Sequence, residues 1–177
     1  AQDGLDLARV CPGRPDGSIT ERVAHAVSRL IRDADFYIDL HTGGTSFQVL
    51  PLVGYMLHSD EGVRERQRQM ARAFSLPVMW GTSANLDGRT LSVARDAGVP
   101  AIYAEYMGGG TCDPRGVQAY VDGCLGVMAH LGMVELPERK SIVEHMVEDN
   151  RPDSGHMKVR NPAPPPGNSD PADGYAA

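Results

Sequence analysis

Apolar residues recur along this chain at two spacings, one typical of amphipathic helices and the other of buried strands. Spacings of three and four residues predict helices over residues 20–33, 59–74, 87–97 and 113–131. Short apolar runs predict strands over residues 36–41, 47–56, 76–80 and 99–106, with a weaker signal at 143–147. This alternation predicts an α/β fold with a mixed, mostly parallel sheet flanked by helices.

Residues that favour helix ends support these boundaries. Ser18 and Glu21 form a capping-box pattern before the first helix, and Pro114 suits the first position of the last helix. We expect the apolar faces of these two helices to pack on the sheet. These faces comprise Val23, Val27, Leu30, Ile31 and Ala34 in the first helix, and Val117, Val121, Cys124, Leu125, Met128 and Leu131 in the last.

The chain divides into a patterned region and a less patterned tail. Residues 1–134 contain most of the predicted helices and strands, after a Gly-, Pro- and Asp-rich loop at 3–17. Charges cluster from residue 135, and residues 161–177 are rich in Pro, Gly and Asp. We therefore expect one α/β domain over 1–134, followed by a linker and a Pro-rich tail over 135–177.

Composition narrows the classes of partner. The 177 residues have a net charge of -6, which argues against nucleic acid because no basic face is available. No apolar run is long enough for a membrane span, and no signal segment is evident. The odd set of Cys11, Cys112 and Cys124 lacks metal-site spacing and is typical of reduced thiols in a cytoplasmic protein.

Residues capable of chemistry follow two of the predicted strands. Asp39 and His41 end one strand before a pair of glycines, and Glu105 ends another before Gly108. Ligands of open α/β sheets gather outside the carboxyl ends of strands. A His that binds a metal and a Glu that moves protons are the minimum parts of metal-assisted hydrolysis. Asp39 lies on the same strand face as His41, so it either orients the imidazole or serves the fold alone.

Two arginines lie in loops expected near the same edge of the sheet. Arg9 belongs to the first loop, and Arg89 begins the short helix before the Glu105 strand. Arginine binds carboxylates through two parallel hydrogen bonds, so both are candidates for binding an acidic substrate. Both residues are equally well explained as solvated surface charges.

Three segments in order resemble the succinylglutamate desuccinylase/aspartoacylase family of the zinc carboxypeptidase superfamily. Residues 3–13 resemble its Asp-Leu-Asn-Arg-x-Phe-Pro-Gly loop, 38–44 its Asp-Leu-His strand end, and 104–110 its Glu-x-Gly-Gly strand end. The resemblance implies a zinc-carboxypeptidase-like fold and a zinc-dependent deacylase of small N-acyl amino acids. It also implies that His41 is a zinc ligand, Glu105 the general base and acid, and Arg9, with Arg89, the contact to the substrate carboxylate.

The chain departs from the family pattern in two ways. Ala8 stands where the family has Asn. The family's other two zinc ligands belong to a His-x-x-Glu motif upstream of the first loop, and the sequence before residue 3 does not contain it. The spacings His58 to Glu61 and His145 to Glu148 match that motif, but they follow His41 in chain order and are interpreted as chance.

These departures predict a truncated family member that binds zinc poorly and is a poor or inactive enzyme by itself. Residues 154–159 are expected to open the family's small C-terminal β domain, which the chain would not complete. An exposed sheet edge would favour self-association into a homo-oligomer. The alternative function is a non-catalytic remnant that binds an acidic small molecule or a partner. A cysteine enzyme based on Cys112, which precedes a helix, remains a further alternative.

Overall fold

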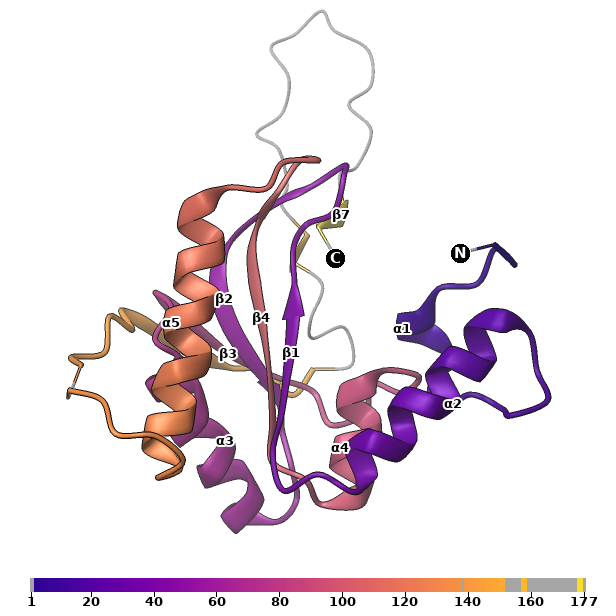
Figure 1. Cartoon of the computed structure of the whole chain (residues 1–177), viewed down its shortest axis with the longest axis horizontal. Helices are drawn as coiled ribbons and strands as arrows, with labels where there is room; N and C mark the ends of the chain where they lie inside the picture. The colour runs from indigo at the N-terminus through magenta and orange to yellow at the C-terminus, as the bar shows by residue number, and fades with distance from the viewer. Residues whose placement is uncertain (1, 138, 152–156, 159–174, 177) are drawn as a thin grey trace, which may run out of the picture.

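A five-stranded mixed sheet forms the centre of the molecule (Figure 1). The computed structural model describes residues 2–137, 139–151, 157–158 and 175–176. The strand order is β1 (Tyr37–His41), β4 (Ala101–Gly108), β2 (Gln48–Met56), β3 (Val78–Thr82) and β5 (His145–Glu148). Within this sheet only β2 and β4 pair antiparallel, whereas β1–β4, β2–β3 and β3–β5 are parallel. The predicted α/β fold with a mixed, mostly parallel sheet is confirmed.

Helices cover both faces of this sheet (Figure 1). The helices α3 (Glu61–Phe74) and α5 (Pro114–His130) lie on one face, and α4 (Thr90–Ala97) lies on the other. The helix α2 (Ile19–Arg32) packs outside α4, next to the four-residue α1 (Leu7–Val10). A second sheet pairs β6 (Met157–Lys158) with β7 (Tyr175–Ala176).

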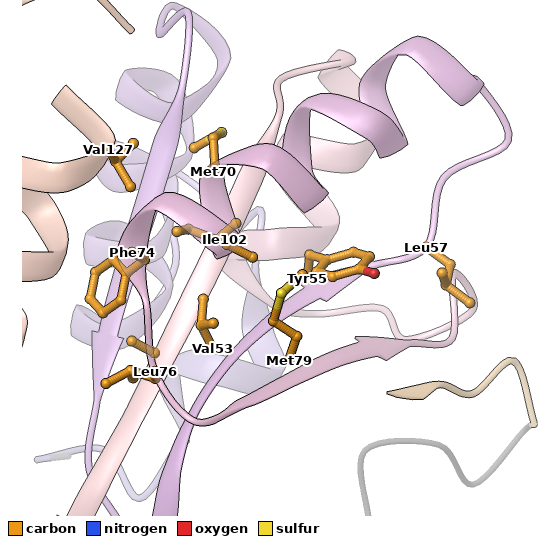
Figure 2. Packing of buried hydrophobic residues seen from close by; sticks show 11 residues of the cluster. Val53, Tyr55, Leu57, Met70, Phe74, Leu76, Met79, Ile102 and Val127 are labelled. Carbon is orange, nitrogen blue, oxygen red and sulfur yellow. The ribbon is translucent and has the colours of Figure 1, made fainter. Parts of the chain in front are cut away.

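Each sheet face has its own apolar core. Figure 2 shows the first, in which Val53 and Ile102 of the sheet meet Met70 and Phe74 of α3 and Val127 of α5. The second core lies under α2 and α4 and contains Ala24, Ile31, Met56, Leu91 and Ala101. Burial of these apolar side chains supplies the main driving force for packing the three layers.

The helix-end signals are confirmed. Ser18 and Glu21 form both bonds of a capping box on α2, and Asp60 and Asp113 cap α3 and α5. The expected loop at 3–17 differs in one respect, because it contains α1. The side chain of Asp6 accepts a hydrogen bond from the Ala8 backbone N–H and starts that helical turn.

The expected apolar face of α5 is wrong in part. Val117, Val121 and Leu125 are exposed, whereas Gly116, Gly123 and Val127 are buried. The glycine face is selected because α3 approaches closely: a Cβ on Gly123 would lie 2.6 Å from the Phe74 ring. The helical spacing of apolar residues predicted an amphipathic helix. It could not reveal that close packing against α3 decides which side of α5 is buried.

The packing of α2 also differs from the expectation. Its principal neighbours are α1 and α4, and the side chains of Val23 and Leu30 remain exposed. Ala24, Ser28 and Ile31 are buried instead. The small residues at 24 and 28 let α2 lie close to the layer beneath, so the bulky pair points outward.

Element boundaries shift by a few residues where proline interrupts the pattern. The strands expected at 76–80 and 99–106 begin at Val78 and Ala101, each just after a proline that has no N–H to donate. The weak strand expected at 143–147 is β5, which pairs with β3 in the main sheet. Most of the strand expected at 154–159 lies outside the described residues. In the described part of the chain, no helix has the length and apolar character of a membrane span.

Candidate active site

The pairing of β1 with β4 brings the two principal candidates together. His41 is in register with Glu105, and Asp39 with Tyr103. Neighbouring residues in register on parallel strands project to the same face of the sheet. The imidazole and the carboxyl group are close enough for their charges to affect each other's pKa. The predicted shared location is confirmed by this register, but only His41 ends its strand, because β4 continues beyond Glu105 to Gly108.

Two glycine-containing turns close the end of the sheet above these residues. The Gly43 N–H donates to the Met107 carbonyl at 2.8 Å, and the Gly109 N–H donates to the Phe47 carbonyl at 2.8 Å. Gly108 has a φ of 136°, and a Cβ there would lie 2.3 Å from the Phe47 carbonyl oxygen. Only glycine satisfies both constraints. Met107 has a φ of 51°, an unfavourable conformation for a side chain of this size, two residues from Glu105.

A carboxylate holds the imidazole of His41. Asp39 Oδ1 lies 3.0 Å from His41 Nε2, and the Thr90 hydroxyl donates to Asp39 Oδ2. The bond to Asp39 raises the pKa of His41 above its ordinary value, although burial opposes the rise. Burial alone would raise the pKa of Asp39, but the bonds from His41 and Thr90 outweigh burial and lower it. At neutral pH Asp39 is therefore an acceptor for the Nε2 proton.

Glu105 lacks the partners that such a buried group normally has. Its Oε2 atom is buried and has no hydrogen-bond partner among the described residues. Burial raises the pKa of Glu105, and this effect outweighs the opposing influence of His41. An unpaired buried carboxyl oxygen costs stability and is typical of a position reserved for a ligand or a transferable proton.

Two tyrosines that the sequence analysis missed complete the surroundings. The Tyr120 hydroxyl of α5 donates to the backbone carbonyl of His41 and so ties α5 to the end of β1. Burial raises the pKa of Tyr103, which lies near both Glu105 and Arg89. Its ring crosses β2 above Gly54, where a Cβ would lie 2.2 Å from the ring. Tyr103 lies within an apolar run that is typical of a buried strand, so its sequence position did not indicate that it lines the site.

The loops that carry the candidate arginines, Arg9 and Arg89, come together through backbone contacts of Gly88, the residue before Arg89. The Cys11 N–H donates to the Gly88 carbonyl at 3.0 Å, and a Cβ on Gly88 would lie 2.7 Å from the Arg9 carbonyl oxygen. Burial, and then the nearby Arg9 charge, lower the pKa of Arg89. Within the described residues no ion pair joins either guanidinium to a carboxylate. The Asp6 charge also acts on Arg89 but forms no ion pair with it, so both guanidinium groups stay available to bind an anion.

The two His-x-x-Glu spacings outside this site have structural explanations. His58 Nδ1 accepts from the Asp60 N–H, and its Nε2 lies 3.1 Å from the Arg95 carbonyl oxygen, so the imidazole helps to order the start of α3. His145 is exposed on β5, and Glu148 pairs with Arg68. Across the described ranges, no group of three His, Cys, Asp or Glu residues could hold a metal ion.

The residues present fit zinc only in part. His41 offers Nδ1, because Nε2 faces Asp39. An imidazole whose second nitrogen is held by a carboxylate is a typical zinc ligand. Catalytic zinc sites use three protein ligands, however, and one imidazole is too few. The described residues therefore provide one ligand position and a neighbouring acid–base group, not a complete zinc site.

Comparison with known proteins shows the family and agrees with the fold. The model of the succinylglutamate desuccinylase/aspartoacylase catalytic domain matches residues 3–131. The chain belongs to this family. The match ends at the end of α5 and includes both strand ends and both arginines.

Individual relatives point to deacylating hydrolases. The N-alpha-acetyl-L-2,4-diaminobutyric acid deacetylase of Halomonas elongata is 32% identical over 136 residues, which is 75% of this chain and 40% of that protein. The crystal structure of a succinylglutamate desuccinylase/aspartoacylase from Rhodobacter sphaeroides matches with a TM-score of 0.75 and 27% identity, over 83% of this chain and 46% of the other. An aspartoacylase family protein from Mesorhizobium loti matches with a TM-score of 0.63 and 30% identity, over 82% and 43%. The chain thus spans less than half the length of these relatives.

Proposed function

We propose that this chain carries the His41–Glu105 part of a zinc-dependent hydrolase site that removes the acyl group from small N-acyl amino acids. The proposal depends chiefly on one observation, the buried and unpartnered Oε2 of Glu105 beside the carboxylate-held His41. Membership of a family whose relatives are deacylating hydrolases supports it.

Glu105 has the properties of a general base that later acts as an acid. Burial raises its pKa, so its carboxylate is a better proton acceptor than a solvated glutamate. Glu105 would take a proton from the attacking water and deliver it to the leaving amine when the amide bond breaks. The proton therefore passes from water to amine through one oxygen, for which the unpartnered Oε2 is the candidate.

His41 would hold the zinc ion through Nδ1. Zinc, when bound, supplies Lewis-acid activation of water and of the acyl carbonyl. The chain's own contribution is to hold the imidazole through Asp39. A complete metal site needs ligands in addition to the described residues, so we expect the 177-residue chain by itself to contain zinc well below one equivalent.

Arg9 and Arg89 would bind the substrate carboxylate. The Arg9 charge acts on Arg89, which is half-buried, and no ion pair joins either guanidinium to a carboxylate among the described residues. A carboxylate between them would relieve the repulsion between the two cations. This role requires a substrate carboxylate, which every N-acyl amino acid has, and leaves the amino acid and the acyl group undefined.

The test uses the longest gene product that contains this chain. Its metal content is measured by elemental analysis, and its hydrolysis of N-acetyl and N-succinyl amino acids is measured with and without a chelator. We expect zinc-dependent release of the free amino acid, and a raised KM in Arg89→Lys because lysine cannot form two parallel hydrogen bonds. Turnover that survives complete removal of the metal would contradict the proposal.

The incomplete metal-ligand set supports a second candidate, binding without turnover. In this case N-acyl amino acids would bind with an affinity that depends on Arg9, but no amine would be released. Isothermal titration of the protein with an N-acyl amino acid in the presence of added zinc, followed by amine analysis of the same sample, separates the two functions.

A further inference from the structure

Asp39 accepts more than one hydrogen bond on the face of β1 that carries His41. Its Oδ1 faces His41 Nε2 at 3.0 Å, and its Oδ2 accepts from the Thr90 hydroxyl. The Tyr37 hydroxyl also lies close enough to hydrogen-bond with the Asp39 side chain. Tyr37, Asp39 and His41 alternate along one strand and share one face, whereas Thr90 comes from a separate element. Thr90 therefore links this row of side chains to α4.

The start of α4 is well suited to act as a fixed support. Thr90 is the first residue of the helix. The Ser92 hydroxyl accepts from the Arg89 N–H at 3.0 Å and donates to the Arg89 carbonyl at 2.6 Å, which closes the turn around Thr90. The next residues, Leu91 and Ser92, are buried in the molecule. The Thr90 hydroxyl is thus held by the packing of the helix, not by a mobile loop.

We propose that Thr90 is a positioning residue of the site, which acts on His41 through Asp39. Its hydroxyl holds the Asp39 carboxylate in one rotamer, and that carboxylate holds the His41 proton on Nε2 and leaves the Nδ1 lone pair free. The use of that lone pair for zinc rests on the proposed function. The positioning itself does not, because it involves only the chain's own residues.

His41 needs such a support because its side chain is only partly enclosed, with 41% of its surface exposed. A partly exposed imidazole rotates and exchanges its ring proton with water unless an acceptor fixes it. Asp39 can be that acceptor only while its own carboxylate is fixed. Thr90 supplies the bond to Oδ2, the oxygen that His41 does not use.

The test measures the His41 ring proton by nuclear magnetic resonance in the 177-residue chain, without metal or substrate. In the wild type, at a pH where the ring is neutral, we expect a downfield Nε2–H resonance and an unprotonated Nδ1. In Thr90→Val, which keeps the shape and removes the hydroxyl, we expect this proton to exchange about fivefold faster, the factor for one lost hydrogen bond. Thr90→Ser should restore the wild-type rate.

The control is Thr82→Val, which removes a buried hydroxyl that donates to the Tyr55 carbonyl. Thr82 lies in β3, which β4 and β2 separate from β1. This control should leave the His41 proton unchanged, and the backbone amide spectra show whether each variant is folded. An unchanged His41 proton in folded Thr90→Val, or no Nε2–H resonance in the wild type, would overturn the proposal. If Thr90→Val does not fold, Thr90→Ser and Thr90→Ala are compared, and equal exchange rates would overturn it. The His41 proton could behave as expected while the longer gene product shows no deacylase activity. That outcome would contradict only the proposed function.

Discussion

Two glutamates near the ends of strands in the same sheet show opposite environments. Glu148 ends β5 and accepts from the Tyr55 hydroxyl at 2.6 Å and from Arg68 Nε and Nη2 at 2.8 and 3.0 Å. These bonds, led by that from Arg68, lower its pKa. Glu105 lies in β4, its Oε2 has no partner among the described residues, and burial raises its pKa. Because β4 and β5 run in opposite directions, the two carboxyl groups lie toward opposite ends of the sheet.

The difference separates a residue that supports the fold from one that is available for chemistry. Glu148 joins β5 to α3 and β2 through charged hydrogen bonds, so its removal should weaken the structure. Glu105 is desolvated without compensation, so its removal should cost no stability. An unsatisfied polar group in a folded protein needs a reason, and a ligand or a transferable proton supplies one here.

The largest expected effect concerns turnover in Glu105→Gln. Glutamine keeps the shape of the side chain but cannot accept a proton, so in the longest gene product kcat should fall by about 10²–10⁴-fold. Zinc content should stay unchanged. Glu148→Gln is the matched control and should retain kcat in the fraction that is folded. Wild-type turnover in Glu105→Gln would remove this residue from the mechanism.

The second effect concerns the free energy of unfolding. Here Glu148→Gln should have the larger effect, whereas Glu105→Gln has the larger effect on kcat. Glu148→Gln should lower the free energy of unfolding by about 1–2 kcal/mol, because glutamine cannot accept both Arg68 bonds and the pair is only partly screened by solvent. Glu105→Gln should leave the free energy of unfolding unchanged or raise it. Urea denaturation of the 177-residue chain measures both. A larger loss in Glu105→Gln would mean that Glu105 has structural partners.

The third effect is that the contributions of Glu148 and Glu105 to the free energy of unfolding depend on pH with opposite sign. The folded pKa of Glu148 is lowered, so its stabilising contribution is present above its unfolded value near 4.5 and is lost as the pH falls through the folded pKa. The folded pKa of Glu105 is raised, so ionisation destabilises the fold as the pH rises from about 4.5 through the folded pKa. Denaturation is measured across this pH range. In Glu148→Gln the free energy of unfolding should no longer fall as the pH is lowered through the folded pKa of Glu148. In Glu105→Gln it should no longer fall as the pH rises toward neutral. The same pH profile in both variants would contradict the comparison.

The smallest effect concerns Arg9. Its guanidinium donates to the Ala8 carbonyl, and no ion pair to a carboxylate holds it in the described chain. Arg9→Gln should therefore change the free energy of unfolding by no more than about 0.5 kcal/mol. Arg68→Gln, which breaks the bond to Glu148, is the control and should cost more. Thermal denaturation of the two variants tests whether Arg9, unlike Arg68, contributes little to the stability of the fold.

Local chemistry made the helix starts and the strand-end residues predictable. Ser18 caps its helix as its neighbours indicated, and the glycines after His41 and Glu105 marked the strand ends. Both signals depend on residues adjacent in sequence, which is why they could be identified without a structure. The antiparallel pairing between β2 and β4 could not, because it depends on contacts between distant segments.

The missed features of the site also depend on distant contacts. Thr90 lies 51 residues from Asp39 in sequence, and Tyr120 lies 79 residues from His41. Neither residue type is distinctive at its position. The roles given to His41, Glu105, Arg9 and Arg89 came from family resemblance and stay predictions. The expected cytoplasmic location, homo-oligomer and absence of nucleic-acid binding stay predictions too.

The pairing of β1 with β4 has a consequence for the order of folding. During synthesis His41 leaves the ribosome well before its register partner Glu105, and the intervening chain must first form β2, α3, β3 and α4. Contacts between such distant segments form slowly because a long loop must close. We therefore expect the two halves of the site to meet late, after the β2–β3 unit has folded. A nascent chain stalled before residue 101 would present β1 without β4, its partner in the described sheet, a state in which chaperone binding is most useful.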